Sequence, residues 1–208
     1  ATQHFTKTAE KEVRILCYQA ERRDRPKVFS DNGLFLLPVR NGYYVILRGE
    51  GYIDISDITS SPVEFTPKAE FELQTPLVGN SEMQHLDYAH ASGMLEDFVA
   101  EGRLYLTIRG RKYTPEFEFR VGGNKITTKG VQTEVDAGYE GEDVVVLIEG
   151  KNTKMQDTII RQLYYPFRKW SIQTNKRVIP MFFEKRGDEY MFWMYEFTDH
   201  DDYNSIRL

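Results

Sequence analysis

Cysteine is nearly absent from this sequence, with Cys17 as the one copy among 208 residues. A single cysteine cannot form a disulfide within the chain, so we expect Cys17 to be a small buried side chain. Hydrophobic residues make up 40% of the chain, yet no apolar run approaches the roughly 18–20 residues that a membrane span needs. The sequence therefore predicts a globular chain that does not cross a membrane.

The first residues also lack the features of a secretory signal peptide. Ala1 to Phe5 contain neither a basic region nor the start of an apolar one. Together with the low cysteine content, this predicts an intracellular, cytoplasmic protein.

The chain has no large excess of charge of either sign. It carries 27 Lys and Arg residues against 32 Asp and Glu residues, a formal net charge of -5. This balance does not exclude a nucleic-acid partner, because carboxylates clustered at a metal site can mask a local basic groove in the total. Net charge alone selects no class of function.

The order of the predicted elements describes an α/β (α+β) chain, in which helices flank a mixed β-sheet. The first part, residues 1–75, is expected to be β-rich, with one helix, then two strands, then an irregular stretch that contains prolines. These elements are predicted over residues 8–23, 34–37, 43–47 and 56–75.

The second part, residues 76–208, holds most of the predicted sheet. Ser81 is expected to cap a helix that runs to about residue 100, and five side chains supply most of its buried stripe: Met83, Leu86, Met94, Leu95 and Phe98. Strands are predicted over residues 104–108, 116–121, 131–136, 144–148, 177–183 and 190–197, with a loop over 138–142. Another helix is predicted over 158–165, which Pro166 should end or kink.

One segment combines strand patterning with reactive side chains. The apolar strand over 144–148 is followed by Glu149-Gly150-Lys151, and alternation along a strand places Glu149 and Lys151 on one face. If the preceding strand pairs antiparallel with this one, Asp136 lies beside them. Two carboxylates from adjacent strands make an oxygen-rich site suited to Mg²⁺. Lys151 would add positive charge where negative charge grows during attack on a phosphate.

These residues resemble the signature of the PD-(D/E)XK nuclease superfamily. In that family a strand aspartate is followed, after a variable gap, by an acid-x-Lys triplet on the next strand and then by a helix. Asp136 matches the first position and Glu149-Gly150-Lys151 the triplet, whereas Val135 stands where the family has proline. The segments 79–84, 107–113 and 161–166 resemble type II restriction endonucleases in particular, and the likeness covers residues of about 79–208.

The resemblance implies a restriction-endonuclease-like fold and an enzyme that cuts double-stranded DNA in a prokaryotic cytoplasm. It implies that Asp136 and Glu149 hold Mg²⁺, and that Lys151 orients or deprotonates the attacking water. A helix glutamate often completes the metal site in this family, which makes Glu82 a candidate, although the helix dipole also favours a carboxylate there. Glu134 could be a further ligand or a hydrated strand carboxylate. Residues 1–75 would supply specificity contacts or the face of a homodimer.

Two groups of polar side chains are candidates for DNA contact. Phosphate binding needs a local density of such groups, and a solvated surface is the alternative for each. The first group precedes the acidic residues and the second follows them: Arg109, Arg111 and Lys112, then Lys154, Arg161 and Gln162.

Two other functions remain open from the sequence. A non-catalytic DNA-binding module could use the same fold. Loss of a site residue would favour that alternative, but Asp136, Glu149 and Lys151 are all present. A repair or recombination nuclease is the second alternative, because residues 160–165 resemble the helix with glutamine and tyrosine that some of these nucleases contain.

Overall fold

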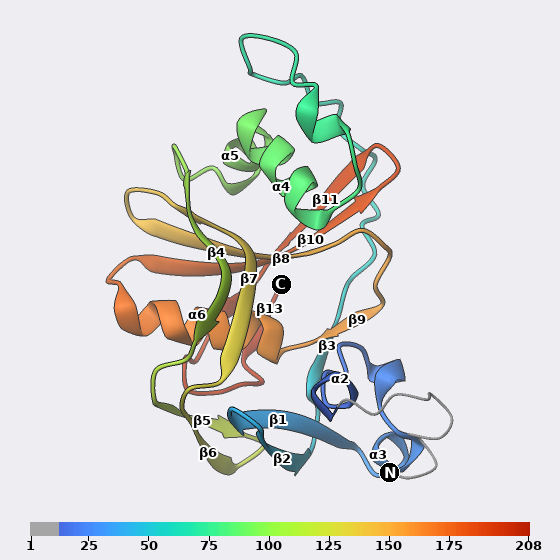
Figure 1. The fold of residues 1–208 in the computed structure, drawn as a ribbon, viewed down its shortest axis with the longest axis vertical. Coiled ribbons are helices and arrows are strands. Elements are labelled where there is room, and N and C mark those ends of the chain that lie inside the picture. The colour runs from blue at the N-terminus through green and yellow to red at the C-terminus, as the bar shows by residue number, and fades with distance from the viewer. Residues whose placement is uncertain (1–12) are drawn as a thin grey trace.

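A computed structural model of the chain describes residues 13–208, and its centre is a five-stranded mixed sheet. The strand order is β11-β10-β8-β7-β4 (Figure 1). β10 and β8 run parallel, whereas the other three neighbouring pairs are antiparallel. The bounds are β4 Tyr105–Tyr113, β7 Gln132–Glu140, β8 Val144–Lys151, β10 Arg177–Arg186 and β11 Glu189–Met194.

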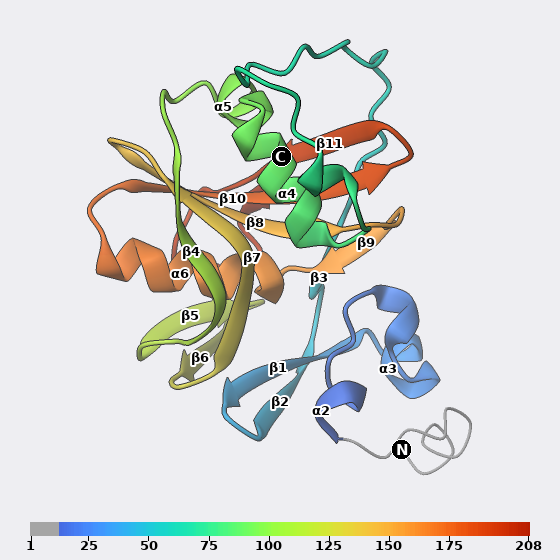
Figure 2. The ribbon, with the colours of Figure 1, turned by 45° about the horizontal axis from the view of Figure 1, so that its top comes forward.

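Helices cover both faces of this sheet, as Figures 1 and 2 show. α4 (Glu82–Ala91) and α5 (Met94–Val99) lie on one side, and α6 (Arg161–Gln173) lies on the other. Alternation along β8 divides its side chains between two apolar cores: Val144, Val146 and Ile148 face α4, and Val145 and Leu147 face α6. The chain is thus an α+β fold with a mixed sheet between helices, as the sequence predicts.

The N-terminal part is β-rich, and its short strand β3 pairs with β9 of the second part, outside the five-stranded sheet. The β1–β2 hairpin precedes β3, and β3 pairs antiparallel with β9, which leads into α6. The elements of this region are α2 Val13–Leu16, η1 Arg22–Asp24, α3 Lys27–Asp31, β1 Leu34–Arg40, β2 Tyr43–Arg48, β3 Tyr52–Asp54 and β9 Asp157–Ile159. A long stretch without regular structure follows β3 and ends at η2 (Thr75–Leu77).

Two small antiparallel pairs complete the described chain. They are the hairpin of β5 (Phe117–Val121) and β6 (Asn124–Thr128), and the pair of β12 (Glu196–Phe197) and β13 (Ile206–Arg207). In the part of the chain that the structure describes, no helix has the length and apolar character that a membrane crossing requires.

The helix predicted over 8–23 ends earlier than expected. Its first residues lie outside the described part, α2 ends at Leu16, and Gln19 has a φ of 40°, which a helix cannot contain. The helix predicted from Ser81 to about residue 100 is divided at Gly93, whose φ of 82° requires glycine. Ser81 caps α4 as predicted.

Three other details of the prediction are wrong. Met83 and Phe98 are 46% and 42% exposed, so they do not belong to the buried stripe. β7 continues to Glu140, because its last residues pair with β8 where a loop was expected. α6 continues through Pro166 to Gln173, since burial of its aromatic side chains outweighs the one backbone hydrogen bond that proline removes.

Candidate active site

The apolar strand β8 carries Glu149 and Lys151 to the floor of a pocket. Both side chains follow Val145 and Leu147 in the two-residue repeat, so they lie on the face that α6 covers. Glu149 is 8% exposed and Lys151 is half-buried. The strand thus places a carboxylate and an ammonium side by side at its end.

Asp136 reaches the same place from β7. Ala137 pairs with Ile148, so Asp136 lies one step further along the antiparallel ladder, beside Glu149. Its carboxylate Oδ2 accepts a hydrogen bond of 2.8 Å from the backbone N–H of Gly150. The predicted convergence of the two acids is therefore present.

The glycine between Glu149 and Lys151 brings α4 close to the site. A Cβ atom added at Gly150 would lie 3.2 Å from the Cβ of Glu82 and 3.5 Å from Cδ1 of Leu86. Because glycine leaves this space open, the first turn of α4 packs on β8 and Glu82 lines the pocket.

Glu149 is held by two side chains. Lys151 Nζ donates to its Oε1 at 2.5 Å and also to the carbonyl of Gly150 at 2.8 Å. Gln162 of α6 donates through Nε2 to the same Oε1. The Oε1 atom of Gln162 in turn accepts from Thr158 at 3.2 Å, which orients the amide.

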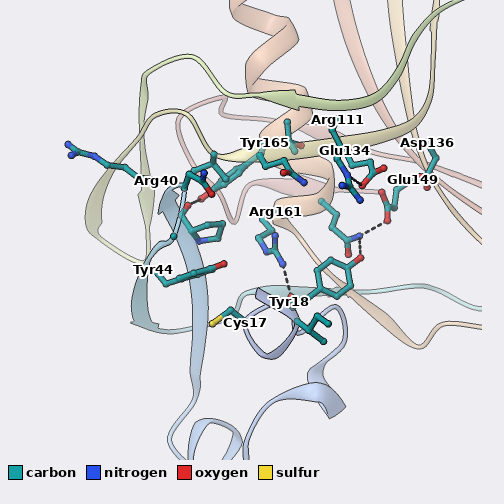
Figure 3. Close-up of a pocket in the computed structure, with 18 of the residues that line it drawn as sticks. Cys17, Tyr18, Arg40, Tyr44, Arg111, Glu134, Asp136, Glu149, Arg161 and Tyr165 are labelled. Carbon is teal, nitrogen blue, oxygen red and sulfur yellow. Dashed lines mark hydrogen bonds and ion pairs between the residues drawn. The ribbon is translucent and has the colours of Figure 1, made fainter. Parts of the chain in front are cut away.

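The N-terminal segment after α2 closes one side of this network. Gln162 Nε2 also donates to the hydroxyl of Tyr18 at 2.9 Å, and Arg161 donates to the Tyr18 carbonyl at 2.6 Å (Figure 3). The Arg161 guanidinium lies 5.5 Å from the centre of the Tyr18 ring. Tyr18 therefore lies against the two polar residues at the start of α6.

Burial sets the protonation of the two acids. It raises the pKa of Glu149 to about 7, an effect that Lys151 opposes and Asp136 reinforces. Burial also raises the pKa of Asp136, against the hydrogen bond from Gly150. Burial alone would lower the pKa of Lys151, but the Glu149 carboxylate outweighs it and raises that pKa above its ordinary value. Lys151 is thus an ammonium at neutral pH, and additional positive charge would favour both carboxylates.

The pocket has a volume of about 450 Å³ and extends from the acidic residues to the β1–β2 turn. Of the residues predicted from the sequence, it brings together Glu82, Asp136, Glu149, Lys151, Arg111, Arg161 and Gln162, with Glu134 beside them. Arg111 is exposed and its Nε is 3.2 Å from Glu134.

Three predicted DNA contacts lie outside this pocket. Arg109 is paired with Asp87 of α4, and Lys154 donates to Asp57 at 2.7 Å. Lys112 is exposed on β4, away from the pocket lining. The structure therefore divides the basic candidates into those that line the pocket and those that do not.

Sequence reasoning missed Tyr18 and the β1–β2 turn as parts of the pocket. Tyr18 is 144 residues from Gln162, and no motif links the two. The turn residues Arg40, Asn41 and Gly42 line the far end of the pocket. Their Asn-Gly sequence indicates a hairpin but carries no signal of what the hairpin faces.

The donor set of the pocket fits a hard divalent cation. Within residues 13–208, no three His, Cys, Asp or Glu side chains converge as a ready metal cluster. Mg²⁺ does not need one, since it is usually held by one or two carboxylates together with water and substrate phosphate. Asp136 and Glu149 are the two carboxylates in position. Burial raises the pKa of both, and a bound cation would lower both pKa values again.

Comparison with known proteins gives a family without a described activity. Neither the curated proteins nor the solved structures contain a match to this chain. Residues 2–46 match the model of a domain of unknown function (DUF6996), and residues 47–208 match that of a second one (DUF6997). The chain therefore belongs to the DUF6997 family, preceded by a DUF6996 segment that supplies Tyr18 and the β1–β2 turn to the pocket.

Proposed function

We propose that this protein is a Mg²⁺-dependent endonuclease that hydrolyses phosphodiester bonds of double-stranded DNA. The observation that carries the proposal is the meeting of Asp136, Glu149 and Lys151, from two adjacent strands, in one pocket. The helix that follows adds Gln162 to Glu149. This order of strand aspartate, neighbouring acid-x-Lys strand and helix is what the PD-(D/E)XK resemblance implies.

In this proposal Asp136 and Glu149 hold the cation. The Gly150 N–H orients Asp136, and Gln162 orients Glu149. Bound Mg²⁺ would supply positive charge to the scissile phosphate and acidify the attacking water. Burial of Glu149 would strengthen these interactions, because charges interact more strongly in a less polar surrounding.

Lys151 supplies a fixed positive charge beside the carboxylates. We propose no role for it as a base that accepts the proton of water, because its Nζ donates to Glu149 Oε1 and to the Gly150 carbonyl. A preorganised ammonium instead favours the negative charge that develops on the phosphoryl oxygens. Arg111 and Arg161, which also line the pocket, are proposed phosphate contacts.

We further propose a sequence-specific restriction enzyme that acts in the cytoplasm of a prokaryote. One observation favours the alternative of a repair or recombination nuclease: Gln162 contacts Glu149 directly, and a helix with glutamine and tyrosine is the feature that resembles those enzymes. Cleavage of only particular sequences in a plasmid would separate the two classes.

The experiment that tests the proposal replaces each carboxylate. Asp136→Ala and Glu149→Ala are expected to abolish Mg²⁺-dependent plasmid cleavage, because a missing ligand removes the position of the ion. Circular dichroism should show both variants folded, since each substitution removes a carboxylate whose charge burial disfavours and leaves the backbone pairing of β7 with β8 in place. Near-normal cutting by either folded variant would refute the assignment.

A further inference from the structure

The β1–β2 hairpin is hydrogen-bonded close to its turn to α6 and to the end of β6. The hydroxyl of Tyr165 in α6 donates to the carbonyl of Pro38 at 2.8 Å. The carbonyl of Val39 accepts from Lys129 N at 3.0 Å and from Thr128 Oγ1 at 3.1 Å. The last residues before the turn are therefore held by α6 and by the end of β6, which sets the position of the turn relative to the carboxylates.

The turn presents two polar side chains at its tip. Arg40 pairs with Tyr43, so Asn41 and Gly42 form a two-residue loop. Gly42 has a φ of 79°, which glycine adopts without strain. Both Arg40 and Asn41 are exposed and line the pocket. Within residues 13–208, Arg40 has no carboxylate at ion-pair distance, unlike Arg109 and Arg111.

The turn lies at the opposite end of the pocket from the acidic residues. Figure 3 shows Arg40 and Tyr44 at one side, Asp136 and Glu149 at the other, and Arg161 between them. The side chain of Arg40 points outward, away from the carboxylates. The same pocket extends from Asp136 and Glu149 to this turn. A nucleic acid with one phosphate beside the two carboxylates would therefore continue past the turn.

We propose that the β1–β2 turn reads base pairs of the DNA through Arg40 and Asn41, an inference that rests on the proposed function. Arginine recognises guanine, and asparagine recognises adenine, through paired hydrogen bonds to the base edges in the major groove. A two-stranded β-ribbon fits into that groove. The three hydrogen bonds at Pro38 and Val39 hold the ribbon rigidly, as a reading element requires.

The test uses a library of DNA duplexes with a randomised segment and the full chain. Bound duplexes are sequenced after retention in Ca²⁺, and cut ends are sequenced after reaction in Mg²⁺. Arg40→Ala and Asn41→Ala should each lower the preference at one or two base pairs by about tenfold to a hundredfold. Arg48→Ala is the matched control, since Arg48 is exposed at the other end of the hairpin, outside the pocket lining.

Arg40→Lys separates base reading from phosphate binding. Lysine keeps the charge but loses the planar fork, so it should fail to restore the preference of the parent if Arg40 reads a guanine. Full restoration by lysine, or an identical preference in the parent and the two alanine variants, would overturn the inference. A parent that cuts or retains DNA without any sequence preference would also overturn it and leave the nuclease proposal intact. A parent that neither cuts nor retains any duplex would refute both.

Discussion

Replacing Lys151 by alanine distinguishes an enzyme from a DNA-binding module. The Lys151 ammonium donates to Glu149 Oε1 and to the Gly150 carbonyl, so its charge is held within the site. Without it, Glu149 keeps Gln162 as a side-chain partner and loses the charge that opposes the rise of its pKa. The substitution should therefore remove a positive charge near the phosphate and reduce the fraction of Glu149 that is ionised.

The expected effect falls on the rate and not on affinity. Loss of one preorganised electrostatic group typically lowers a rate by about 100-fold or more. The Lys151 side chain is 19% exposed and paired inside the protein, so it contributes little to ground-state DNA binding. We therefore expect Lys151→Ala to bind DNA within a few-fold of the parent and to cut it at least ~100-fold more slowly.

Single-turnover cleavage at saturating protein measures the chemical step, and a binding titration in Ca²⁺ measures affinity. Lys125→Ala is a suitable control, because Lys125 is an exposed lysine on β6 that pairs with Glu118 at 2.7 Å. If Lys151 only anchors a phosphate, the variant will bind weakly and recover the full rate at saturation. That result would refute the role assigned to its charge.

Three further predictions concern the surroundings of the acids. Tyr18→Phe removes the hydroxyl that accepts from Gln162, so we expect kcat to fall several-fold at unchanged KM, and an unchanged kcat would show that Tyr18 only packs. Burial raises the pKa of Glu149 from 4.5 in the unfolded chain to about 7 in the folded protein. The protonated form of Glu149 therefore stabilises the fold below about pH 4.5, and this stabilisation is lost as the pH rises through about 7. The loss in the free energy of unfolding has an upper limit of roughly 3 kcal/mol. Urea unfolding in a chelator should show this loss in the parent and not in Glu149→Gln, and equal pH profiles would contradict it. Arg111→Ala should lower the salt slope of DNA binding by about one, because Arg111 lines the pocket, whereas Arg109→Ala should change it less, because Arg109 lies outside it. Equal slopes for the parent and Arg111→Ala would show that Arg111 contacts no phosphate.

The local parts of the fold and of the site could be predicted from the sequence. The apolar run of β8 specifies a buried strand, and alternation along it puts Glu149 and Lys151 on one face. The position of Asp136 required one additional assumption, that β7 pairs antiparallel with β8, and the register confirms it. These features depend on neighbouring residues and a two-residue period, which a sequence displays directly.

Contacts between distant segments could not be predicted in the same way. Tyr18 reaches Gln162 across 144 residues, because the N-terminal segment folds back on α6, and no periodicity encodes that contact. The extent of α6 was also missed, since its buried aromatic side chains outweigh the local preference of Pro166. Packing decided both outcomes, and a single sequence does not show which faces meet.

The most direct test of the central claim is the cleavage of a covalently closed plasmid by the metal-free parent protein when Mg²⁺ is added. We predict nicked and linear products that form with Mg²⁺ and stop forming when a chelator is added, because in the proposed function Asp136 and Glu149 act on a phosphate through a bound cation. A plasmid that remains supercoiled at saturating protein and Mg²⁺ would contradict the claim that this pocket hydrolyses DNA.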